Sequence, residues 1–243
     1  MTGPIELVIF DCDGVLVDSE PLFVRLQIAL GAELGWPLTQ REAIERFVGR
    51  SRQSIIEQIA ARLGDETAAI WWERLIRRHE AAIEAEITPI EGITEALDAL
   101  EALALPICVA SNGRHEKVRH ALGRTGLYER FAGRVHTAAD VAHGKPAPDL
   151  FLYAAQRMGV DPAACVVVED SRSGVQAARA AGMRAFGYAG GLTPAEWLAG
   201  PGTVVFHAMR ELPALLTSRR RQQGQRTPAA RRRSPGPPSP AYR

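Results

Sequence analysis

Short apolar runs alternate along this chain with longer segments whose apolar positions recur at helical spacing. Continuous apolar runs are typical of strands that are buried on both faces. The stronger runs are Leu7–Phe10, Ile107–Ala110, Cys165–Val168 and Arg184–Gly187, and the weaker ones are Val135–Thr137 and Val204–Phe206. We therefore predict a parallel sheet built from strand–helix–strand units.

Helical periodicity fills the segments between these runs. We expect helices over Glu91–Leu103, His115–Arg124, Pro148–Met158 and Ser171–Ala181. Gly182 is placed to end the last of them, because glycine tolerates the left-handed backbone that follows many helices. Thr193-Pro194-Ala195-Glu196 has the spacing of a capping box with proline at the first helical position, which predicts a short helix there. The alternation indicates an α/β fold with a doubly wound, Rossmann-like parallel sheet.

The first two strong strands are separated by about 100 residues, far more than an ordinary crossover needs. Helical signals fill this interval: Thr39 and Glu42 have capping-box spacing, Ser51 and Asp65 are candidate N-caps, and Gly64 can end a helix. We therefore predict that residues 19–87 form an α-helical cap inserted into a core made of residues 1–18 and 88–217. A cap that begins directly after the first strand should lie over the carboxyl ends of the strands, where open α/β sheets bind ligands.

Charge is distributed unevenly along the chain. The formal net charge is +1, but residues 218–243 contain eight arginines and no acidic residue, which leaves 21 basic against 28 acidic residues in the body. A body with a net charge of −7 is not typical of a nucleic-acid-binding domain. The basic segment is rich in Pro, Gly and Ser, and we predict a disordered tail. Its arginines could contact nucleic acid or acidic membranes, or the tail could be a solvated extension without such a role.

Three cysteines, Cys12, Cys108 and Cys165, lie in or beside apolar runs. We interpret them as reduced thiols of the core, which favours a cytoplasmic protein. The N-terminus lacks the basic start and cleavage site of a secretory signal, and no apolar run reaches the roughly 18 residues of a membrane span. We expect no membrane partner, no nucleic-acid partner for the folded body, and a monomer.

Polar motifs follow the predicted strands where each strand ends. They are Asp11-Cys-Asp13-Gly after the first strand, Ser111-Asn112-Gly113 after the second, Lys145-Pro146 further along, and Glu169-Asp170 after the Cys165 strand. Because the carboxyl ends of parallel strands share one edge of a sheet, these motifs should converge on one crevice.

The residue types at this crevice suit phosphoryl chemistry. Crowded carboxylates repel one another unless a divalent cation neutralises them, and ligands that offer only oxygen suit Mg²⁺. A lysine, a serine hydroxyl and the backbone N–H groups near Asn112 and Gly113 would face an anion. A phosphoryl group would bridge the two sides, and a carboxylate can attack its phosphorus to form an aspartyl-phosphate. One aspartate of the Asp11 and Asp13 pair would then be the nucleophile, and the other would handle the proton.

Taken together, the segments DCDGVLVDSE (11–20), SNG (111–113), GKPAPD (144–149) and EDSRSG (169–174) closely resemble the four motifs of the haloacid dehalogenase-like hydrolases. The resemblance covers roughly residues 5 to 190 and is strongest in the phosphatase and β-phosphoglucomutase branch. Each motif alone is weak, but four in order, each after a strand, are specific.

The resemblance implies a role for each matching residue. Asp11 would be the nucleophile and a Mg²⁺ ligand, and Asp13 would bind the metal through its carbonyl and act as general acid and base. Ser111 with the amides of Asn112 and Gly113 would hold the phosphoryl oxygens, and Lys145 would offset charge on nucleophile and phosphate. Glu169 and Asp170 would complete the metal site. Families with dehalogenase activity usually lack the second aspartate, so Asp13 favours phosphate chemistry.

The cap should carry substrate selectivity, and the candidates are Glu20, Phe23, Arg50 and Arg52. An arginine in the cap suits a second anionic group on the substrate, although surface arginines are an equally good interpretation. Sugar-phosphate mutases of this branch carry a histidine where this chain has Phe23, and a cap lysine where it has Val48. Both differences favour simple hydrolysis.

We therefore predict a Mg²⁺-dependent phosphatase that acts on a small phosphorylated metabolite, such as a sugar phosphate, a sugar-acid phosphate or phosphoglycolate. A phosphosugar mutase is the alternative enzyme. A non-catalytic scaffold whose basic tail binds nucleic acid or a partner is the alternative of another class. Each motif also has a structural interpretation: the Asp11 and Ser111 motifs as turns, Lys145 as a surface lysine, and Glu169-Asp170 as negative charge at a helix N-terminus.

Overall fold

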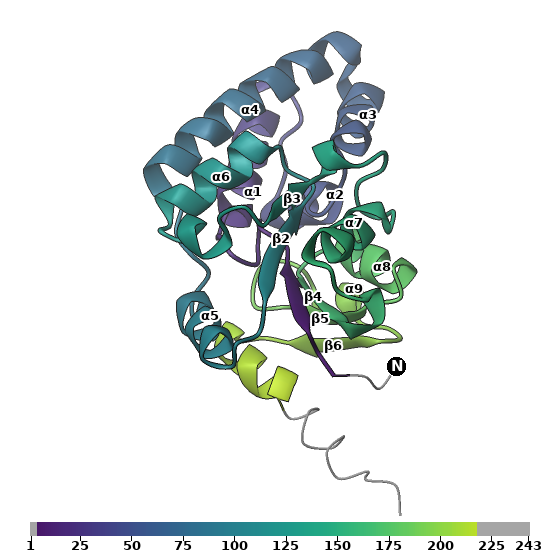
Figure 1. Ribbon diagram of the computed structural model, residues 1–243. Helices are drawn as coiled ribbons and strands as arrows, with labels where there is room; N and C mark the ends of the chain where they lie inside the picture. The colour runs from purple at the N-terminus through teal and green to yellow at the C-terminus, as the bar shows by residue number, and fades with distance from the viewer. Residues whose placement is uncertain (1–3, 218–243) are drawn as a thin grey trace, which may run out of the picture.

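Six parallel strands form one sheet in the order β3-β2-β1-β4-β5-β6 (Figure 1). The computed structural model describes residues 4–217, so the predicted tail at 218–243 lies outside the described residues. The strands are β1 Leu7–Phe10, β2 Ile107–Ser111, β3 Val135–Thr137, β4 Cys165–Glu169, β5 Arg184–Tyr188 and β6 Thr203–Phe206. All six predicted strands are confirmed, with end points that differ by at most one residue.

Helices cover both faces of the sheet, which explains why the strand sequences are apolar throughout. In β1, Leu7 and Ile9 face α7, α8 and α9, whereas Val8 and Phe10 face α5 and α6. The helices of the core are α5 Ile93–Ala102, α6 His115–Arg124, α7 Asp149–Met158, α8 Arg172–Ala180 and α9 Ala195–Leu198. Single 3₁₀ turns lie at Tyr128–Phe131, Ala138–Asp140, Pro162–Ala164 and Met209–Glu211. The predicted α/β layering is therefore confirmed.

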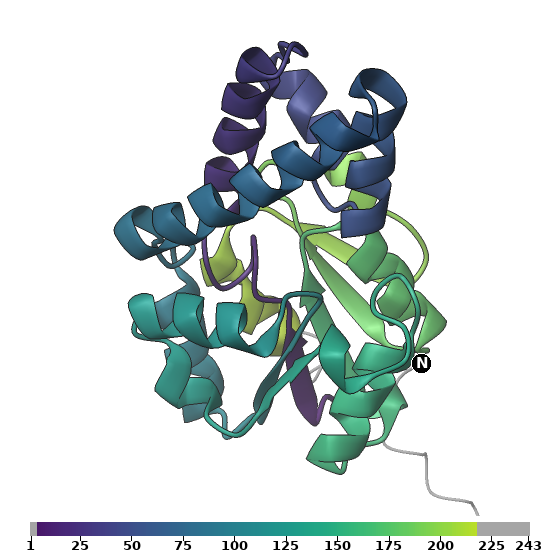
Figure 2. The same ribbon diagram turned by 90° about the horizontal axis from the view of Figure 1, so that it is seen from above.

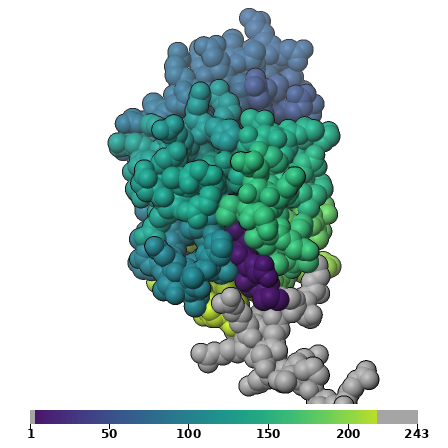
Figure 3. Space-filling view, viewed as in Figure 1, coloured from purple at the N-terminus to yellow at the C-terminus, as the bar shows by residue number. Residues whose placement is uncertain are grey.

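The predicted helical insert is also present. Helices α1 Glu20–Glu33, α2 Gln40–Phe47, α3 Arg52–Leu63 and α4 Asp65–Glu86 follow β1 and gather at one end of the molecule (Figures 1 and 2). They bury an apolar cluster of their own, centred on Phe47, Ile59 and Trp71. In the space-filling view this cap forms the blue end of the molecule, above the teal and green surface of the core (Figure 3). Within residues 4–217, no helix is long and apolar enough to span a membrane.

Four of the predicted helix signals are confirmed and two are wrong. The Thr39 capping box, the Ser51 cap and the end of α3 at Gly64 are present, and Gly182, at φ +71°, follows the end of α8 as predicted. Asp65, in contrast, is the first residue of α4, and Gly64 with φ +87° precedes it as N-cap. Thr193 does not cap α9: Pro194 is the N-cap with an extended ψ of 135°, and the Thr193 hydroxyl is buried without a hydrogen-bond partner.

The strand order creates a crevice near the middle of the sheet. From β1 the chain builds outward through β2 and β3 on one side, and from β4 through β5 and β6 on the other. Strands β1 and β4 are direct neighbours, with Phe10 opposite Val168, although they are far apart in the sequence. The loops that leave them at their carboxyl ends diverge, which is where doubly wound sheets bind ligands. Asp11 and Asp170 each come directly after one of these two strands.

Candidate active site

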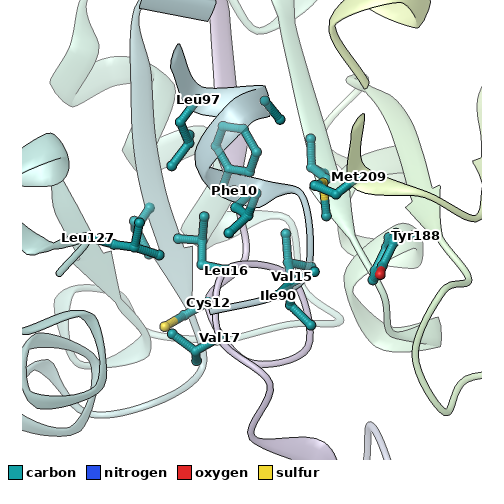
Figure 4. Close-up of a cluster of buried hydrophobic side chains, with 14 of the residues drawn as sticks. Phe10, Cys12, Val15, Leu16, Val17, Ile90, Leu97, Leu127, Tyr188 and Met209 are labelled. Atoms are coloured by element: carbon teal, nitrogen blue, oxygen red, sulfur yellow. The ribbon is translucent and has the colours of Figure 1, made fainter. Parts of the chain in front are cut away.

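The loop after β1 is anchored by its apolar residues. Cys12, Val15, Leu16 and Val17 are buried in the core cluster beneath the loop, beside Phe10 and Ile90 (Figure 4). The backbone turns back on itself, and the N–H of Gly14, at φ +76°, donates to the carbonyl of Val17 at 2.8 Å. Because the apolar side chains fix the loop from below, the two aspartates are left on the side of the loop that lines the main cavity.

Three carboxylates converge at the switch point. Ligand oxygens of Asp11, Glu169 and Asp170 lie within 4.8 Å of one another, and all three residues are buried. The Asp170 Oδ2 atom is buried without a hydrogen-bond partner, and a Cβ on Gly14 would come within 2.1 Å of it. Burial raises the pKa of Asp11 to about 7, and burial together with the charge of Glu20 raises the pKa of Asp170 well above its usual range. A divalent cation would relieve this repulsion, because an all-oxygen donor set fits such an ion.

Lys145 supplies the positive charge beside this cluster. Its Nζ donates to Asp11 Oδ1 at 2.7 Å and to Glu169 Oε1 at 2.6 Å, and only 3% of its side chain is exposed. Burial disfavours the charged ammonium, but the two carboxylates outweigh burial and raise the pKa of Lys145. The ammonium also lies 4.9 Å from the centre of the Phe151 ring. Lys145 is therefore a buried cation at the site and not a surface residue.

Glu169 is held in place by the start of α8. Its Oε2 accepts from the backbone N–H of Ser171 at 2.9 Å and from the Ser171 hydroxyl at 2.8 Å. A Cβ on Gly174 would come within 1.8 Å of the Glu169 carboxyl carbon, so only glycine fits there. The Glu169 carboxylate thus complements the N-terminus of α8 and at the same time belongs to the carboxylate cluster.

Asp13 is not part of the three-carboxylate cluster. Its carboxylate accepts two hydrogen bonds from Lys117 Nζ, at 2.8 and 2.9 Å, and one from the Ser19 hydroxyl at 2.6 Å. Burial would raise the pKa of Asp13, but the charge and hydrogen bonds of Lys117 outweigh it, so this pKa is lowered. In this arrangement Asp13 is an ionised carboxylate that pairs with Lys117, whereas Asp11 pairs with Lys145.

The Ser111 motif lies next to the Lys145 loop. The Ser111 hydroxyl accepts from the N–H of Gly113 at 3.0 Å. The side-chain amide of Asn112 both accepts from the backbone N–H of Lys145 at 2.9 Å and donates to its carbonyl at 3.1 Å. Asn112 therefore positions the Lys145 loop through its side chain. All three residues of the motif line the same cavity as Asp11 and Lys145.

The cavity has a volume of about 420 Å³ and lies between the core and the cap. Of the four cap residues named from the sequence, Glu20, Phe23 and Arg50 line it. Arg52 does not: its guanidinium lies 5.3 Å from the centre of the Trp72 ring, on α4. Burial raises the pKa of Glu20 to about 8, and its Oε2 is buried without a hydrogen-bond partner.

Several further residues reach the cavity that the sequence analysis did not identify. They are Ser19, His79, Lys117, Arg172, Gln176, Thr193 and Trp197. Lys117 lies in the first turn of α6, shortly after the Ser111 motif, so its position in the sequence could have identified it as a candidate site residue. His79 lies in the middle of α4 and reaches the site only because the cap folds over it. Its ring contacts Phe23 edge to face, with centroids 5.8 Å apart.

The burial of His79 predicts a loss of stability in acid. Burial lowers the pKa of His79 from 6.5 to about 4, so the ring is protonated at a lower pH in the folded protein than in the unfolded chain. The neutral His79 ring therefore does not reduce the free energy of unfolding above about pH 6.5. As the pH falls towards 4, this free energy decreases by up to about 3 kcal/mol. We expect the free energy of unfolding, measured in urea, to depend less on pH between 6.5 and 4 in His79→Phe than in the native protein. His143→Asn, at an exposed histidine, is the control, and equal slopes in both variants would contradict the prediction.

Comparison with known proteins matches this chain to a protein family. The family model for haloacid dehalogenase-like hydrolases matches residues 5–182. The 6-phosphogluconate phosphatase of Escherichia coli K12 is 35% identical over 183 residues, which cover 75% of this chain and 81% of the relative. Fructose-1-phosphate phosphatase of the same organism is 36% identical over 195 residues, with 73% and 93% coverage.

A solved structure agrees with these sequence matches. It is a family hydrolase from Deinococcus radiodurans R1 with bound phosphate and sodium, and its fold superimposes with a TM-score of 0.76. The two chains are 32% identical, and the match covers 89% of this chain and 96% of the other. The carboxylate cluster, the buried lysine, the helical insert and the sequence matches lead to one conclusion: this chain belongs to the haloacid dehalogenase-like hydrolases.

Proposed function

We propose that the protein is a Mg²⁺-dependent phosphatase that hydrolyses a small phosphorylated metabolite through an aspartyl-phosphate on Asp11. The observation that carries the proposal is the bridge from Lys145 to Asp11 and Glu169, at 2.7 and 2.6 Å, beside a three-carboxylate cluster in the cavity. The Lys145 ammonium, placed next to the Asp11 carboxylate, would stabilise the negative charge of a phosphoryl group bound against that nucleophile.

The residues present fit a magnesium ion. The unpartnered Asp170 Oδ2 atom and the all-oxygen donors of Asp11, Glu169 and Asp170 suit a hard divalent cation. We propose that Asp11 and Asp170 hold it directly, with Glu169 beside them and the carbonyl of Asp13 as a further ligand. When bound, the ion would neutralise charge on the nucleophile and on the transferred phosphoryl group.

In the first step, an Asp11 carboxylate oxygen attacks phosphorus and the bond from phosphorus to the ester oxygen breaks. The leaving oxygen takes the electron pair and receives a proton from Asp13. In the second step, Asp13 removes a proton from water, the water oxygen attacks phosphorus, and the Asp11–phosphorus bond breaks to release phosphate. Asp13 is held as a carboxylate by Lys117 here, so an anionic substrate that draws Lys117 away would raise the pKa of Asp13 and prepare it as the acid.

The size of the cavity and the names of the relatives support a proposal for the substrate class. A volume of about 420 Å³ is near the lower end for ligand sites and suits a small metabolite. The two relatives described above are named as phosphatases of a sugar-acid phosphate and of a sugar phosphate. We propose a phosphorylated sugar or sugar acid for this chain, with phosphoglycolate as the smaller candidate.

Release of inorganic phosphate from a panel of phosphorylated metabolites tests the proposal. We expect turnover with Mg²⁺, loss of turnover when EDTA removes the ion, and recovery when Mg²⁺ is restored, because the unneutralised carboxylates would repel the substrate. Circular dichroism recorded alongside would show whether the fold persists without the ion. Turnover that is unaffected by chelation would contradict the metal assignment.

Phosphate release measured together with the interconversion of phosphosugar isomers separates the alternatives. A mutase would interconvert phosphosugar isomers faster than it releases phosphate. This alternative is tested because His79 places an imidazole beside Phe23, the position at which mutases of this branch carry a histidine. A scaffold whose tail is the functional part would show no turnover with any metabolite. We expect a chain that ends at residue 217 to release phosphate as fast as the full chain, since the whole proposed site lies within residues 4–217.

A further inference from the structure

Charge is unevenly distributed around the main cavity. The carboxylates of Asp11, Asp13, Glu20, Glu169 and Asp170 all belong to the buried or half-buried part of its lining. The exposed residues of the lining include two arginines, Arg50 from the cap and Arg172 from the core. The outer part of the cavity therefore differs in charge from the part that carries the proposed chemistry.

Each of the two arginines adjoins a direct contact between cap and core. The Ser173 hydroxyl donates to the carbonyl of Gly49 at 3.4 Å. A Cβ on Gly49 would lie 3.4 Å from the Cβ of Ser171, so the two backbones are in close approach. Arg50 directly follows Gly49, and Arg172 lies between Ser171 and Ser173. Both arginines therefore flank the point where the cap meets the start of α8.

Neither guanidinium is neutralised. Lys117 and Lys145, the other cations of the cavity, are each paired with carboxylates. Within residues 4–217, Arg50 and Arg172 form no ion pair with a carboxylate, so both remain free to bind an external anion. Arg172 is partly held in place, because its guanidinium lies 4.9 Å from the centre of the Trp197 ring. Stacking of this kind reduces the conformational entropy that an arginine loses when it binds an anion.

We propose that Arg50 and Arg172 form a subsite for a second anionic group, a carboxylate or a phosphate, at the end of the substrate remote from the transferred phosphoryl group. The inference rests on the proposed phosphatase function and narrows its substrate class. Sugar-acid phosphates and sugar bisphosphates would be preferred over phosphates of neutral sugars and hexitols. Two guanidinium groups with hydrogen-bond donors in a fixed plane suit either anion.

The subsite has one arginine from each side of the cavity. Because Arg50 belongs to the cap and Arg172 to the core, both can reach one anion only while the cap contacts the core. Binding of a doubly anionic substrate would therefore stabilise this contact between cap and core and help to exclude water from the phosphoryl group. Arg52, the other candidate of the cap sequence, lies over Trp72 and has no part in this subsite.

Steady-state kinetics with three substrates of similar size test the subsite: 6-phosphogluconate, fructose 1,6-bisphosphate and glucitol 6-phosphate. We expect Arg172→Ala and Arg50→Ala each to raise KM for the first two by about tenfold, the loss of one charge-assisted contact, and to change glucitol 6-phosphate less than twofold. A larger effect on the carboxylate or on the bisphosphate identifies which anion the subsite prefers. Arg46→Ala is the matched control, because Arg46 stacks on Trp36 in the cap and does not line the cavity.

Equal increases in KM for all three substrates would overturn the subsite, because they would indicate only a general effect of charge. Calorimetry on the Asp11→Asn background adds a readout that needs no turnover: Arg172→Ala should weaken binding of 6-phosphogluconate about tenfold and leave glucitol 6-phosphate unchanged. If the unsubstituted enzyme releases phosphate from all three substrates but the arginine variants do not discriminate, the inference fails and the proposed function stands. Absence of turnover with every phosphate ester would remove the proposed function itself.

Discussion

Substitution of Asp11 by asparagine should reduce phosphate release by at least about 10⁴-fold, because the amide has no anionic oxygen to attack phosphorus. The fold should persist. Burial already raises the pKa of Asp11 to about 7, so the site disfavours the charged form, and a neutral amide of the same shape avoids that desolvation cost. The amide oxygen can still accept from Lys145, which donates to Asp11 Oδ1 at 2.7 Å in the native site.

Two measurements check this result together. Phosphate release gives the loss of turnover, and intact mass after brief mixing with substrate should reveal a phosphoryl adduct on the native protein and none on the variant. Asp98→Asn, at a surface aspartate paired with Arg130, is the matched control and should retain activity. Residual turnover above about one per cent of the native rate would show that a different group attacks phosphorus.

Replacement of Lys145 by methionine should damage both stability and activity. Methionine keeps most of the side-chain volume but leaves the carboxylates of Asp11 and Glu169 without their cation, in a site where the Glu169 side chain is fully buried. Breaking a buried pair in this way costs about 3–5 kcal/mol of unfolding free energy. Phosphate release should fall by about 10³-fold, since the phosphoryl group loses its buried positive partner.

The pH dependence of the destabilisation distinguishes loss of the buried positive charge from simple loss of packing. Without Lys145, the folded state should raise the pKa of the Asp11 carboxyl further, so the folded state binds more protons than the unfolded chain. The destabilisation should therefore be large at neutral pH and shrink in acid, which urea unfolding at several pH values would measure. Adding Glu169→Gln to the variant should recover part of the stability but none of the activity. A destabilisation that is independent of pH would indicate that packing alone was lost.

The framework of the site could be predicted because its signals are local. A buried strand followed by a polar motif is visible in the sequence, and parallel strands bring their carboxyl ends to one edge. Asp11, Ser111 and Glu169 could therefore be expected from the sequence to share a crevice. The position of Lys145 between two carboxylates and its complete burial do not follow from this topology, because Lys145 lies in the loop beyond β3, which the Asn112 side chain holds in place.

The remaining site residues depend on how the cap sits on the core. His79 lies in mid-helix, and nothing local distinguishes its face from the faces that contact solvent. Arg52 was as good a candidate as Arg50 in the sequence, but a ring on the neighbouring helix, Trp72, holds it away from the cavity. Arg172 lies within one of the four motifs, yet its stacking on Trp197 requires a contact between segments that the pattern does not link.

The errors at helix starts have a different origin. A capping box assumes that the chain enters the helix directly after the capping residue. At Pro194 the backbone stays extended, so α9 begins one residue later and the Thr193 hydroxyl cannot reach the expected amide. At Asp65, the preceding Gly64 both ends α3 and begins α4, which leaves no room for a separate capping residue.

The independent aromatic core of the cap has an implication for how such enzymes diversify. Because Phe47 and Trp71 are buried among cap residues, substitutions on the cap face that lines the cavity need not disturb the sheet that carries the nucleophile. New substrate preferences could then accumulate in the cap while the residues that carry the reaction are inherited unchanged in the core. Exchange of whole caps between distant relatives would be a practical route to engineering new hydrolases from this scaffold.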